Sequence, residues 1–221
     1  MGFSREWDDL FKKNTHLSIW PWSDLITYVM RYARPEGTNF KVLELGCGAG
    51  ANIPFFLSFE NVRYHAIEGS KTMVNRLKEK FPQLSNNIKV GDFTENLPFD
   101  SEFDLIFDRG ALTCNTTRSI KRCLNIIYSK LKINGRYICI DLYSVMDSNF
   151  KKGNRVDEFT KNGFTEGTFA FTGNVHFSNK KHILDLFDKF NIIKLEHKIH
   201  KTEIPANNQV FASWNLVAVK N

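Results

Sequence analysis

Apolar positions along the chain alternate between short continuous runs and segments with helical spacing. The continuous runs predict strands at 41–45, 62–67, 88–90, 103–107, 136–142, 191–199 and 209–219. Apolar residues spaced three or four apart predict helices at 5–12, 22–33, 52–58, 71–80, 117–131 and 179–189. Strands that alternate with helices predict an α/β fold, in which a mostly parallel sheet carries helices on both faces.

The two ends of this pattern depart from strict alternation. Only a turn sequence separates the last two strands, so they are expected to pair antiparallel. Residues 144–175 are polar and lack a clear period, which predicts irregular structure. A chain of 221 residues is expected to be a single domain, with a helical segment at 1–38 and an insert at 144–178.

Composition narrows the class of protein. There is no apolar run of about 18 residues and no signal-peptide core, so we expect a cytoplasmic protein without membrane insertion. Cys47, Cys114, Cys123 and Cys139 show no C-x-x-C spacing, which favours reduced thiols over a disulfide frame or a metal site. The net charge is a modest +6, yet the stretch 109–140 has seven basic residues and no acidic one. This is either a solvated helix face or a surface that attracts an anionic substrate, with Arg118 best placed near a helix start.

The segment 42–52, VLELGCGAGAN, carries the main functional signal. A buried strand ends in Glu44 and is followed by Gly46, Gly48 and Gly50. Glycines let the backbone approach a ligand closely and adopt positive φ. The ligand is therefore expected over the carboxyl end of this strand. The spacing Gly46-x-Gly48-x-x-Ala51 also fits the fingerprint of dinucleotide-binding proteins. The motif alone therefore does not decide whether the ligand is a dinucleotide or another nucleoside-containing cofactor.

Two later strand ends add to the signal. Glu68 ends the second strand and could accept hydrogen bonds from both ribose hydroxyls of a dinucleotide or of another nucleoside-containing cofactor. Gly91-Asp92-Phe93 follows the third strand, where an Asp can accept from an adenine amino group and a Phe can pack on the ring.

Together, these motifs resemble those of class I S-adenosylmethionine (SAM) dependent methyltransferases. ELGCGAG is similar to motif I, Gly91-Asp92-Phe93 to motif III, and FDLIFDRGAL, with Asp108 at its strand end, to motif IV. The resemblance covers about residues 40 to 145. It implies a Rossmann-like sandwich with a seven-stranded, mostly parallel sheet and an antiparallel last strand. It also implies SAM as cofactor and S-adenosylhomocysteine (SAH) as product.

The resemblance also suggests which residues hold the cofactor. Ile19-Trp20-Pro21-Trp22 would fold over it, with Trp20 or Trp22 as the lid, although core packing is an equal alternative. Arg31 could reach the methionine carboxylate. The expected cofactor-binding residues are Trp20, Arg31, Glu44, Gly46, Cys47, Gly48, Gly50, Asn52, Glu68, Gly69, Ser70, Met73, Gly91, Asp92, Phe93, Asp108 and Arg109.

Methyl transfer requires alignment of donor and acceptor, and an alcohol acceptor also benefits from a general base. Asp108 is expected beside the methyl group, and Asp141, Tyr143 and His176 are the candidates for a base near the strand ends. His176 could equally be structural. The candidates for acceptor binding are Arg109, Arg118, Tyr143 and His176.

The acceptor is expected to be a small molecule. Residues 108–111 read DRGA instead of a D-P-P-Y type element, and the chain has no Pro-Cys pair, so nucleic-acid bases are disfavoured. The WPWSDL and DRGALT segments are similar to those of bacterial methyltransferases of surface-polysaccharide biosynthesis, which suggests a sugar, sugar-nucleotide or phosphate-type acceptor. The protein would be a monomer or homodimer. The alternatives are a nicotinamide-dependent oxidoreductase and a non-catalytic SAM-binding module.

Overall fold

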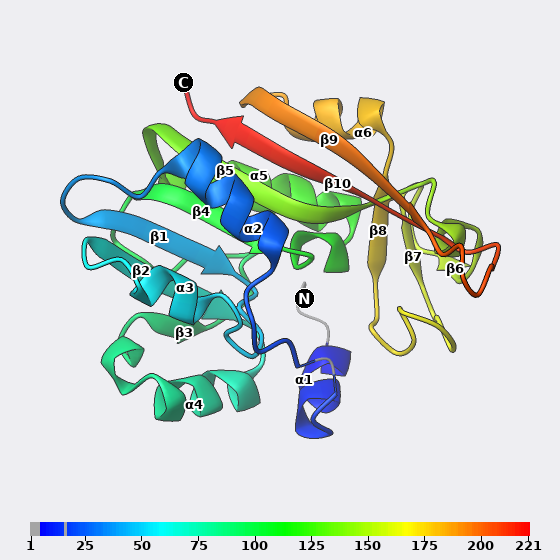
Figure 1. Ribbon diagram of the computed structural model, residues 1–221, viewed down its shortest axis with the longest axis horizontal. Helices are drawn as coiled ribbons and strands as arrows, with labels where there is room; N and C mark the ends of the chain where they lie inside the picture. Colours follow the sequence, from blue (N-terminus) through cyan, green and yellow to red (C-terminus); the bar gives the residue numbers. More distant parts are fainter. Residues whose placement is uncertain (1–4, 16) are drawn as a thin grey trace.

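A mixed sheet forms the centre of the molecule. The computed structural model describes residues 5–15 and 17–221. The sheet has ten strands in the part of the chain that the structure describes, and seven of them follow the order β3-β2-β1-β4-β5-β10-β9 (Figure 1). Their bounds are β1 Phe40–Leu45, β2 Val62–Glu68, β3 Ile88–Val90, β4 Phe103–Arg109, β5 Leu131–Ser144, β9 Asn191–Lys201 and β10 Val210–Val219. β1 to β5 are parallel, and β10 runs antiparallel to both β5 and β9. The mostly parallel fold and its terminal hairpin are therefore confirmed, and the insert adds three short strands to the predicted seven.

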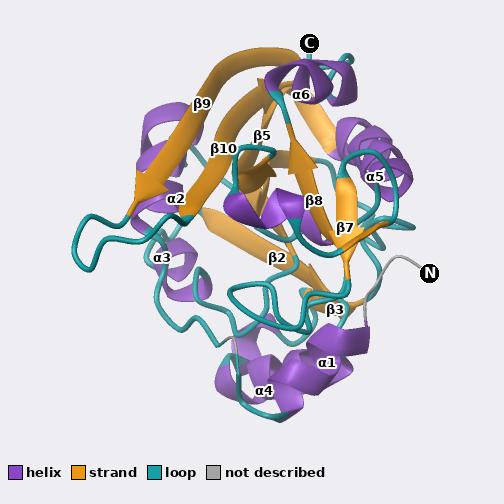
Figure 2. Cartoon of the chain, turned by 90° about the vertical axis from the view of Figure 1, so that its right-hand side faces the viewer, coloured by secondary structure: helices purple, strands orange, loops and turns teal. Residues whose placement is uncertain are grey.

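Helices cover both faces of the sheet, as Figures 1 and 2 show. The α-helices are α1 Arg5–Lys12, α2 Ser23–Tyr28, α3 Ile53–Leu57, α4 Lys71–Lys80, α5 Thr117–Lys130 and α6 Lys180–Leu186. A π-helical turn, η1 Val29–Ala33, continues α2, and 3₁₀ turns lie at η2 Pro82–Leu84, η3 Leu112–Cys114 and η4 Ser148–Lys151. α5 and α6 share one core cluster with the sheet, and α2, α3 and α4 share the other. No helix in the described ranges is long and apolar enough to cross a membrane.

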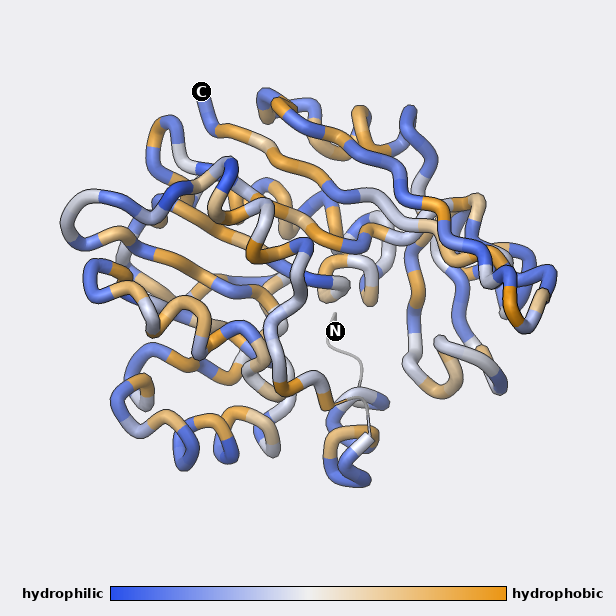
Figure 3. The backbone as a smooth tube through the Cα atoms, viewed as in Figure 1, coloured by the Kyte–Doolittle hydropathy of each residue, from blue (hydrophilic) through white to orange (hydrophobic). Residues whose placement is uncertain are grey.

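The strand residues alternate between these two cores. On β1, Leu43 and Leu45 pack toward α5, whereas Val42 packs toward α2 and α3. On β4, Ile106 faces α5 while Leu105 and Phe107 face the other way. Both faces are apolar, as a doubly covered sheet requires, and the hydrophobic colouring of Figure 3 follows β1, β4 and β10.

A β-bulge near the end of β5 resets this alternation. Trp214 pairs with Leu142 and Leu216 with Cys139, so two residues of β5 face the single Asn215 of β10. One of the two is Asp141, which has φ 60°. An extra residue in the left-handed region is a known form of bulge, and it moves the following side chains to opposite faces. Leu142 consequently packs in the α5 core, and Tyr143 is left on the other side of the sheet.

The insert holds more regular structure than the sequence predicted. Three short strands, β6 Asn154–Arg155, β7 Thr160–Asn162 and β8 Val175–Ser178, occupy the region expected to be irregular. β8 pairs parallel with the last two residues of β5, beyond the end of β4. Strands of two to four residues carry too little periodicity to be recognised. They form here because the overhang of β5 offers unpaired backbone groups.

Element boundaries also differ from the prediction. The expected helix 22–33 divides into α2 and a π-turn, and α6 ends three residues earlier than expected. β5 begins at Leu131 and not after the expected Asn134-Gly135 turn. Asn134 has φ 62° within the strand, and a Cβ on Gly135 would lie 2.8 Å from the Lys132 carbonyl oxygen. These residues therefore form an irregularity inside β5.

One carboxylate ties the insert to helix α5. Asp157 accepts hydrogen bonds from the backbone N–H groups of Thr117, Phe159 and Thr160, and from the hydroxyls of both threonines. Thr117 begins α5, so Asp157 joins the insert to the start of that helix. Burial acts to raise the pKa of Asp157, but these donors hold it below the usual 3.8.

We predict that Asp157→Ala lowers the free energy of unfolding by about 1–3 kcal/mol, because three partly buried N–H groups lose their acceptor. Since its pKa is lowered in the folded protein, the ionised carboxylate stabilises the fold above pH 4, and this contribution is lost as the pH falls through the folded pKa. Urea denaturation of both proteins should show a difference at pH 6 that narrows at pH 3. Equal differences at the two pH values would contradict this account.

Candidate active site

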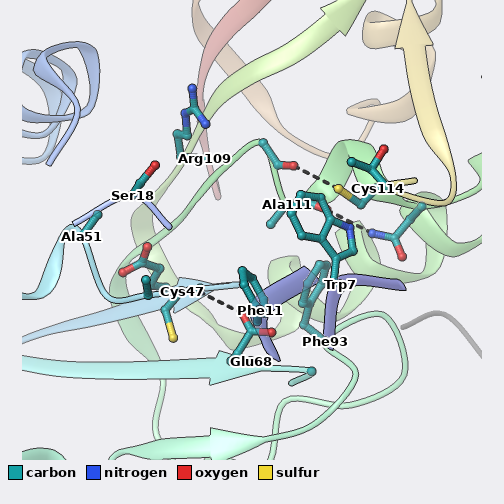
Figure 4. A pocket seen from close by; sticks show the side chains of 18 of the residues that line it. Trp7, Phe11, Ser18, Cys47, Ala51, Glu68, Phe93, Arg109, Ala111 and Cys114 are labelled. Atoms are coloured by element: carbon teal, nitrogen blue, oxygen red, sulfur yellow. Dashed lines mark hydrogen bonds between the residues drawn. The ribbon is translucent and has the colours of Figure 1, made fainter. Parts of the chain in front are cut away.

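A cavity of about 490 Å³ lies over the carboxyl ends of the parallel strands (Figure 4). Such a volume is typical of small-molecule sites. Its walls come from α1 and the segment after it, the ends of β1, β2, β4 and β5, the insert and β10. The lining residues are Trp7, Phe11, Leu17, Ser18, Trp22, Glu44, Gly46, Cys47, Gly48, Ala49, Ala51, Asn52, Glu68, Gly69, Gly91, Asp92, Phe93, Arg109, Gly110, Ala111, Cys114, Asn115, Tyr143, Thr168, Phe169, Thr172, Val175 and Phe211.

The glycine loop after β1 forms one wall. Gly46 and Gly48 line the cavity with φ 66° and 49°. A Cβ on Gly46 would collide with the Ala111 Cβ at 2.5 Å, whereas one on Gly48 would meet nothing nearer than Phe11 at 3.9 Å. Gly48 therefore keeps the cavity open. Gly50 does not line it, and its Cβ would instead lie 2.6 Å from Leu77 of α4.

Glu68 joins the loop to the end of β2. Its carboxylate accepts a 2.8 Å hydrogen bond from the Gly48 N–H and another of 2.8 Å from the Ser70 N–H. The side chain is only 4% exposed. Burial raises the pKa of Glu68, although these N–H donors act in the opposite direction. The carboxylate thus both shapes the loop and faces the cavity.

Glu44 and Asn52 form a buried polar pair on the same wall. The Asn52 amide donates to Glu44 Oε1 at 2.8 Å, and the Tyr64 hydroxyl donates to Glu44 Oε2. Asn52 Oδ1 is buried and has no hydrogen-bond partner among the described residues. Buried polar atoms are normally paired, so an unpaired acceptor on a cavity wall indicates a ligand that donates to it.

Aromatic side chains close the cavity from two sides. Phe93, which follows β3 and lies next to Asp92, points into it, as do Trp7 and Phe11 from α1 (Figure 4). Asp92 Oδ1 accepts from the backbone and hydroxyl of Thr94. The described part of the 1–38 segment therefore supplies a cover, although α2 packs in the core instead. Residues 1–4 and 16 of that segment lie outside the described residues.

Arg109 lines the cavity at the end of β4, between the glycine-loop wall and the residues of β5, β10 and the insert. Its guanidinium carbon lies 3.7 Å from the centre of the Trp22 ring, and Nη2 lies 3.2 Å from Asp141 Oδ2. Asp141 also accepts from Ser213 and Lys198. Arg109 therefore pairs with Asp141 and not with Asp108. Its Nε is buried and has no hydrogen-bond partner among the described residues.

Asp108 does not line the cavity. Strand alternation turns it toward α5, where it is fully buried. Its carboxylate accepts from the N–H groups of Ala111 and Leu112 and from the Tyr137 hydroxyl at 2.6 Å. Asp108 therefore holds the turn after β4, and Arg109 and Gly110 take the positions that face the ligand space.

His176 and Asp141 also lie behind the cavity wall. His176 is 1% exposed, with Nδ1 3.0 Å from the Thr160 hydroxyl and Nε2 3.2 Å from His182 Nε2. Burial, together with the neighbouring His182, lowers the pKa of His176 to about 3. The ring is therefore neutral at physiological pH. Tyr143 is the one predicted candidate for a base that reaches the cavity, and burial raises the pKa of its hydroxyl.

Several other predicted residues lie outside the lining. Trp20 is 75% exposed, and Arg31 and Arg118 are exposed as well. Ser70 caps α4 by accepting from the Met73 N–H, and Met73 is buried in that helix. The cavity instead brings in residues that the sequence did not indicate, namely Trp7, Phe11, Cys114, Phe169 and Phe211. Trp7 and Phe11 are four residues apart, and this helical spacing could have suggested an inward aromatic face of α1. No local feature of the sequence marks Phe169 or Phe211.

Comparison with known proteins agrees with this geometry. Residues 42–135 match a family model described as a methyltransferase domain. This stretch runs from β1 into β5 and contains the glycine loop, Glu68, Asp92 and Arg109. Among curated proteins, no sequence matches this chain.

Solved structures share the whole architecture. The chain is similar to the N-methyltransferase NodS from Bradyrhizobium japonicum WM9 in complex with SAH, with 13% identity, TM-score 0.65, and 98% of this chain and 99% of that one covered. It is also similar to a SAM-dependent methyltransferase from Anabaena variabilis ATCC 29413, with 13% identity, TM-score 0.68, and 98% of this chain and 93% of that one covered. A third similar structure is a SAM-dependent methyltransferase from Clostridium acetobutylicum ATCC 824, with 16% identity, TM-score 0.64, and 97% of this chain and 96% of that one covered. The chain therefore has the fold of SAM-dependent methyltransferases.

The buried Glu44 makes stability depend on pH. Burial raises its pKa from 4.5 to about 7. Between these values the unfolded chain ionises while the folded one does not, so stability should fall as the pH rises from 4.5 to 7. We predict that Glu44→Gln removes this slope, which amounts to roughly 3 kcal/mol at most. Urea denaturation at pH 5 and pH 8 measures it. The exposed Glu60→Gln is the control, and a wild-type slope retained in Glu44→Gln would rule out this assignment.

Proposed function

We propose that the protein is a SAM-dependent methyltransferase acting on a small-molecule acceptor. The observation that carries this proposal is the unpaired Asn52 Oδ1, buried beside Glu44 at the glycine loop. It calls for a donor such as an ammonium group. The acidic side chains Glu68 and Asp92 on the same cavity suit the hydroxyl and amino donors of a nucleoside. The matching family model and the shared fold support the same assignment.

Different residues of the cavity wall would bind different parts of the cofactor. Glu68 would accept from the ribose hydroxyls. Asp92 and Phe93 would hold the adenine, and Asn52 with Glu44 the methionine ammonium. The cofactor supplies an electrophilic methyl group on a positively charged sulfur. The acidic walls offset that charge.

The chain contributes alignment and exclusion of water. Trp7 and Phe11 cover the cofactor side, and the Tyr143 hydroxyl faces the cavity without a hydrogen-bond partner among the described residues. With its raised pKa, Tyr143 stays protonated and orients an acceptor instead of deprotonating it. The positions of Asp108, Asp141 and His176 do not support the predicted direct catalytic roles, which stay predictions.

The finer identity of the acceptor stays a prediction. An anionic sugar, sugar-nucleotide or phosphate-type acceptor was expected with Arg118 as its anchor, and the exposed position of Arg118 away from the cavity lends this no support. A role in polysaccharide biosynthesis, a cytoplasmic location and a monomeric or dimeric state are likewise predictions.

Incubation with SAM carrying an isotopic methyl label, together with fractionated metabolites, glycans, proteins and nucleic acids, tests the proposal. Label is expected in the small-molecule fraction. Absence of label with intact SAH binding would favour a binding module, and affinity for NAD(H) without affinity for SAH would favour the oxidoreductase.

We predict that Glu68→Ala weakens SAH binding at least about tenfold, or 1.4 kcal/mol. The variant removes the ribose acceptor and frees the Gly48 N–H. Titration calorimetry measures the affinity. The exposed Glu60→Ala serves as a matched control, and an unchanged affinity in Glu68→Ala would remove Glu68 from the site.

A further inference from the structure

The half of the cavity away from the glycine loop has a different chemistry. We define the insert wall as Tyr143, Thr168, Phe169, Thr172, Val175 and Phe211, all of which line the cavity. None of these side chains carries a charge at neutral pH. The acidic and basic lining residues are Glu44, Glu68, Asp92 and Arg109, and they belong to the ends of β1, β2, β3 and β4. The insert wall is therefore a neutral surface that faces one lined by acidic and basic side chains.

Aromatic rings dominate the insert wall. The Tyr143 ring centre lies 4.7 Å from that of Phe169 and 5.9 Å from that of Phe211. Phe169 packs further against Phe177 in the core of the insert. Ring clusters of this kind favour flat apolar ligands, which bury area and can stack or meet edge to face.

The polar groups on this side are mostly occupied within the protein. The Thr172 hydroxyl donates to the Phe169 carbonyl, the Asn115 amide to Ala111 and Leu112, and the Cys114 thiol to Gly110. Besides the exposed Thr168, this leaves the Tyr143 hydroxyl and the Asn115 side-chain oxygen, which can only accept. A sugar nucleotide, which presents many hydroxyls and a diphosphate, would lose its hydration here without replacement.

Among the residues that the structure describes, no side chain on this half can serve as a general base. His176 and Asp141 lie behind the wall, and Asp141 is engaged by Arg109, Lys198 and Ser213. Glu44 and Glu68 lie on the opposite side and are bonded to their own neighbours. An alcohol or ordinary phenol would therefore remain protonated. A nucleophile that ionises by itself in water needs no base, and Arg109, with its unpaired Nε, can stabilise the resulting anion.

We propose, on the basis of the function proposed above, that the acceptor is a small aromatic molecule whose thiol or acidic phenol is methylated as its anion beside Arg109. The acceptor loses its proton to water before transfer. The bond from its sulfur or oxygen to the methyl carbon forms as the carbon–sulfur bond of the sulfonium breaks. The electron pair returns to the donor sulfur, which becomes a neutral thioether.

The test uses the full chain and isotopically methyl-labelled SAM with four compounds, each with an enzyme-free control. Thiophenol and 4-nitrophenol ionise near neutral pH, benzyl alcohol presents a similar ring without an acidic group, and UDP-glucose represents an anionic sugar nucleotide. We expect labelling of the first two at rates roughly 100-fold or more above benzyl alcohol, the factor a missing base would cost, and none of UDP-glucose. Labelling of 4-nitrophenol should rise with pH as this acceptor ionises.

Comparable labelling of benzyl alcohol, or any preference for UDP-glucose, would overturn this inference. Absence of label in all aromatic compounds while SAH binds by calorimetry would also overturn it and leave the methyltransferase proposal standing. Absence of SAH binding would instead overturn the proposed function itself.

A pair of variants locates the acceptor. Phe211→Glu places a charge on the insert wall, and we predict a KM for thiophenol raised about tenfold or more with SAH affinity within about twofold. Ile199→Glu adds the same charge on neighbouring β9, where Ile199 is 46% exposed and lies outside the lining, and should leave both values unchanged. Unchanged SAH affinity shows that each variant is folded. An unaltered KM in Phe211→Glu would remove the insert wall from the acceptor site.

Discussion

The carboxylate of Asp141 holds together the parts of the molecule that shape the cavity. It accepts from Arg109 at the end of β4, from Lys198 on β9 and from Ser213 on β10. Lys198 extends the network to Asp24 of α2. Because Asp141 is also the left-handed residue of the β5 bulge, its backbone directs Tyr143 toward the cavity while its side chain fixes Arg109. A residue in this region of φ is strained, and the surrounding contacts maintain it.

The cavity combines two surfaces of different origin. The cofactor side follows from parallel pairing, which brings the ends of β1, β2 and β4 to one edge of the sheet. The insert wall, which we propose as the acceptor side, depends on the overhang of β5 past β4, where β8 pairs and carries the insert. The cofactor surface is rich in carboxylates and backbone groups, whereas the insert wall is aromatic and neutral. In the function that we propose, this division separates recognition of the cofactor from recognition of an apolar acceptor.

Much of the cofactor side could be predicted. Glu44, Gly46, Gly48, Glu68 and Asp92 were all expected near the ligand, and all line the cavity. A glycine loop and residues at the ends of parallel strands are local features of the sequence. The side-chain direction of Asp108 was harder to foresee, because a residue at a strand end can face either layer. Its contact with Tyr137 comes from β5, which pairs beside it only in the folded sheet.

The sequence by itself determined the order of the helices and of the seven longer strands, the parallel sheet and the glycine loop, because these follow from periodicity and backbone freedom within a few residues. Tertiary structure alone decided the insert wall. Tyr143, Phe169 and Phe211 are brought together by a bulge, an overhanging strand and an antiparallel hairpin, each of which depends on pairing between distant segments. It also decided that His176 and Asp141 lie behind the wall, because burial and partners are properties of the packed chain and not of its local pattern.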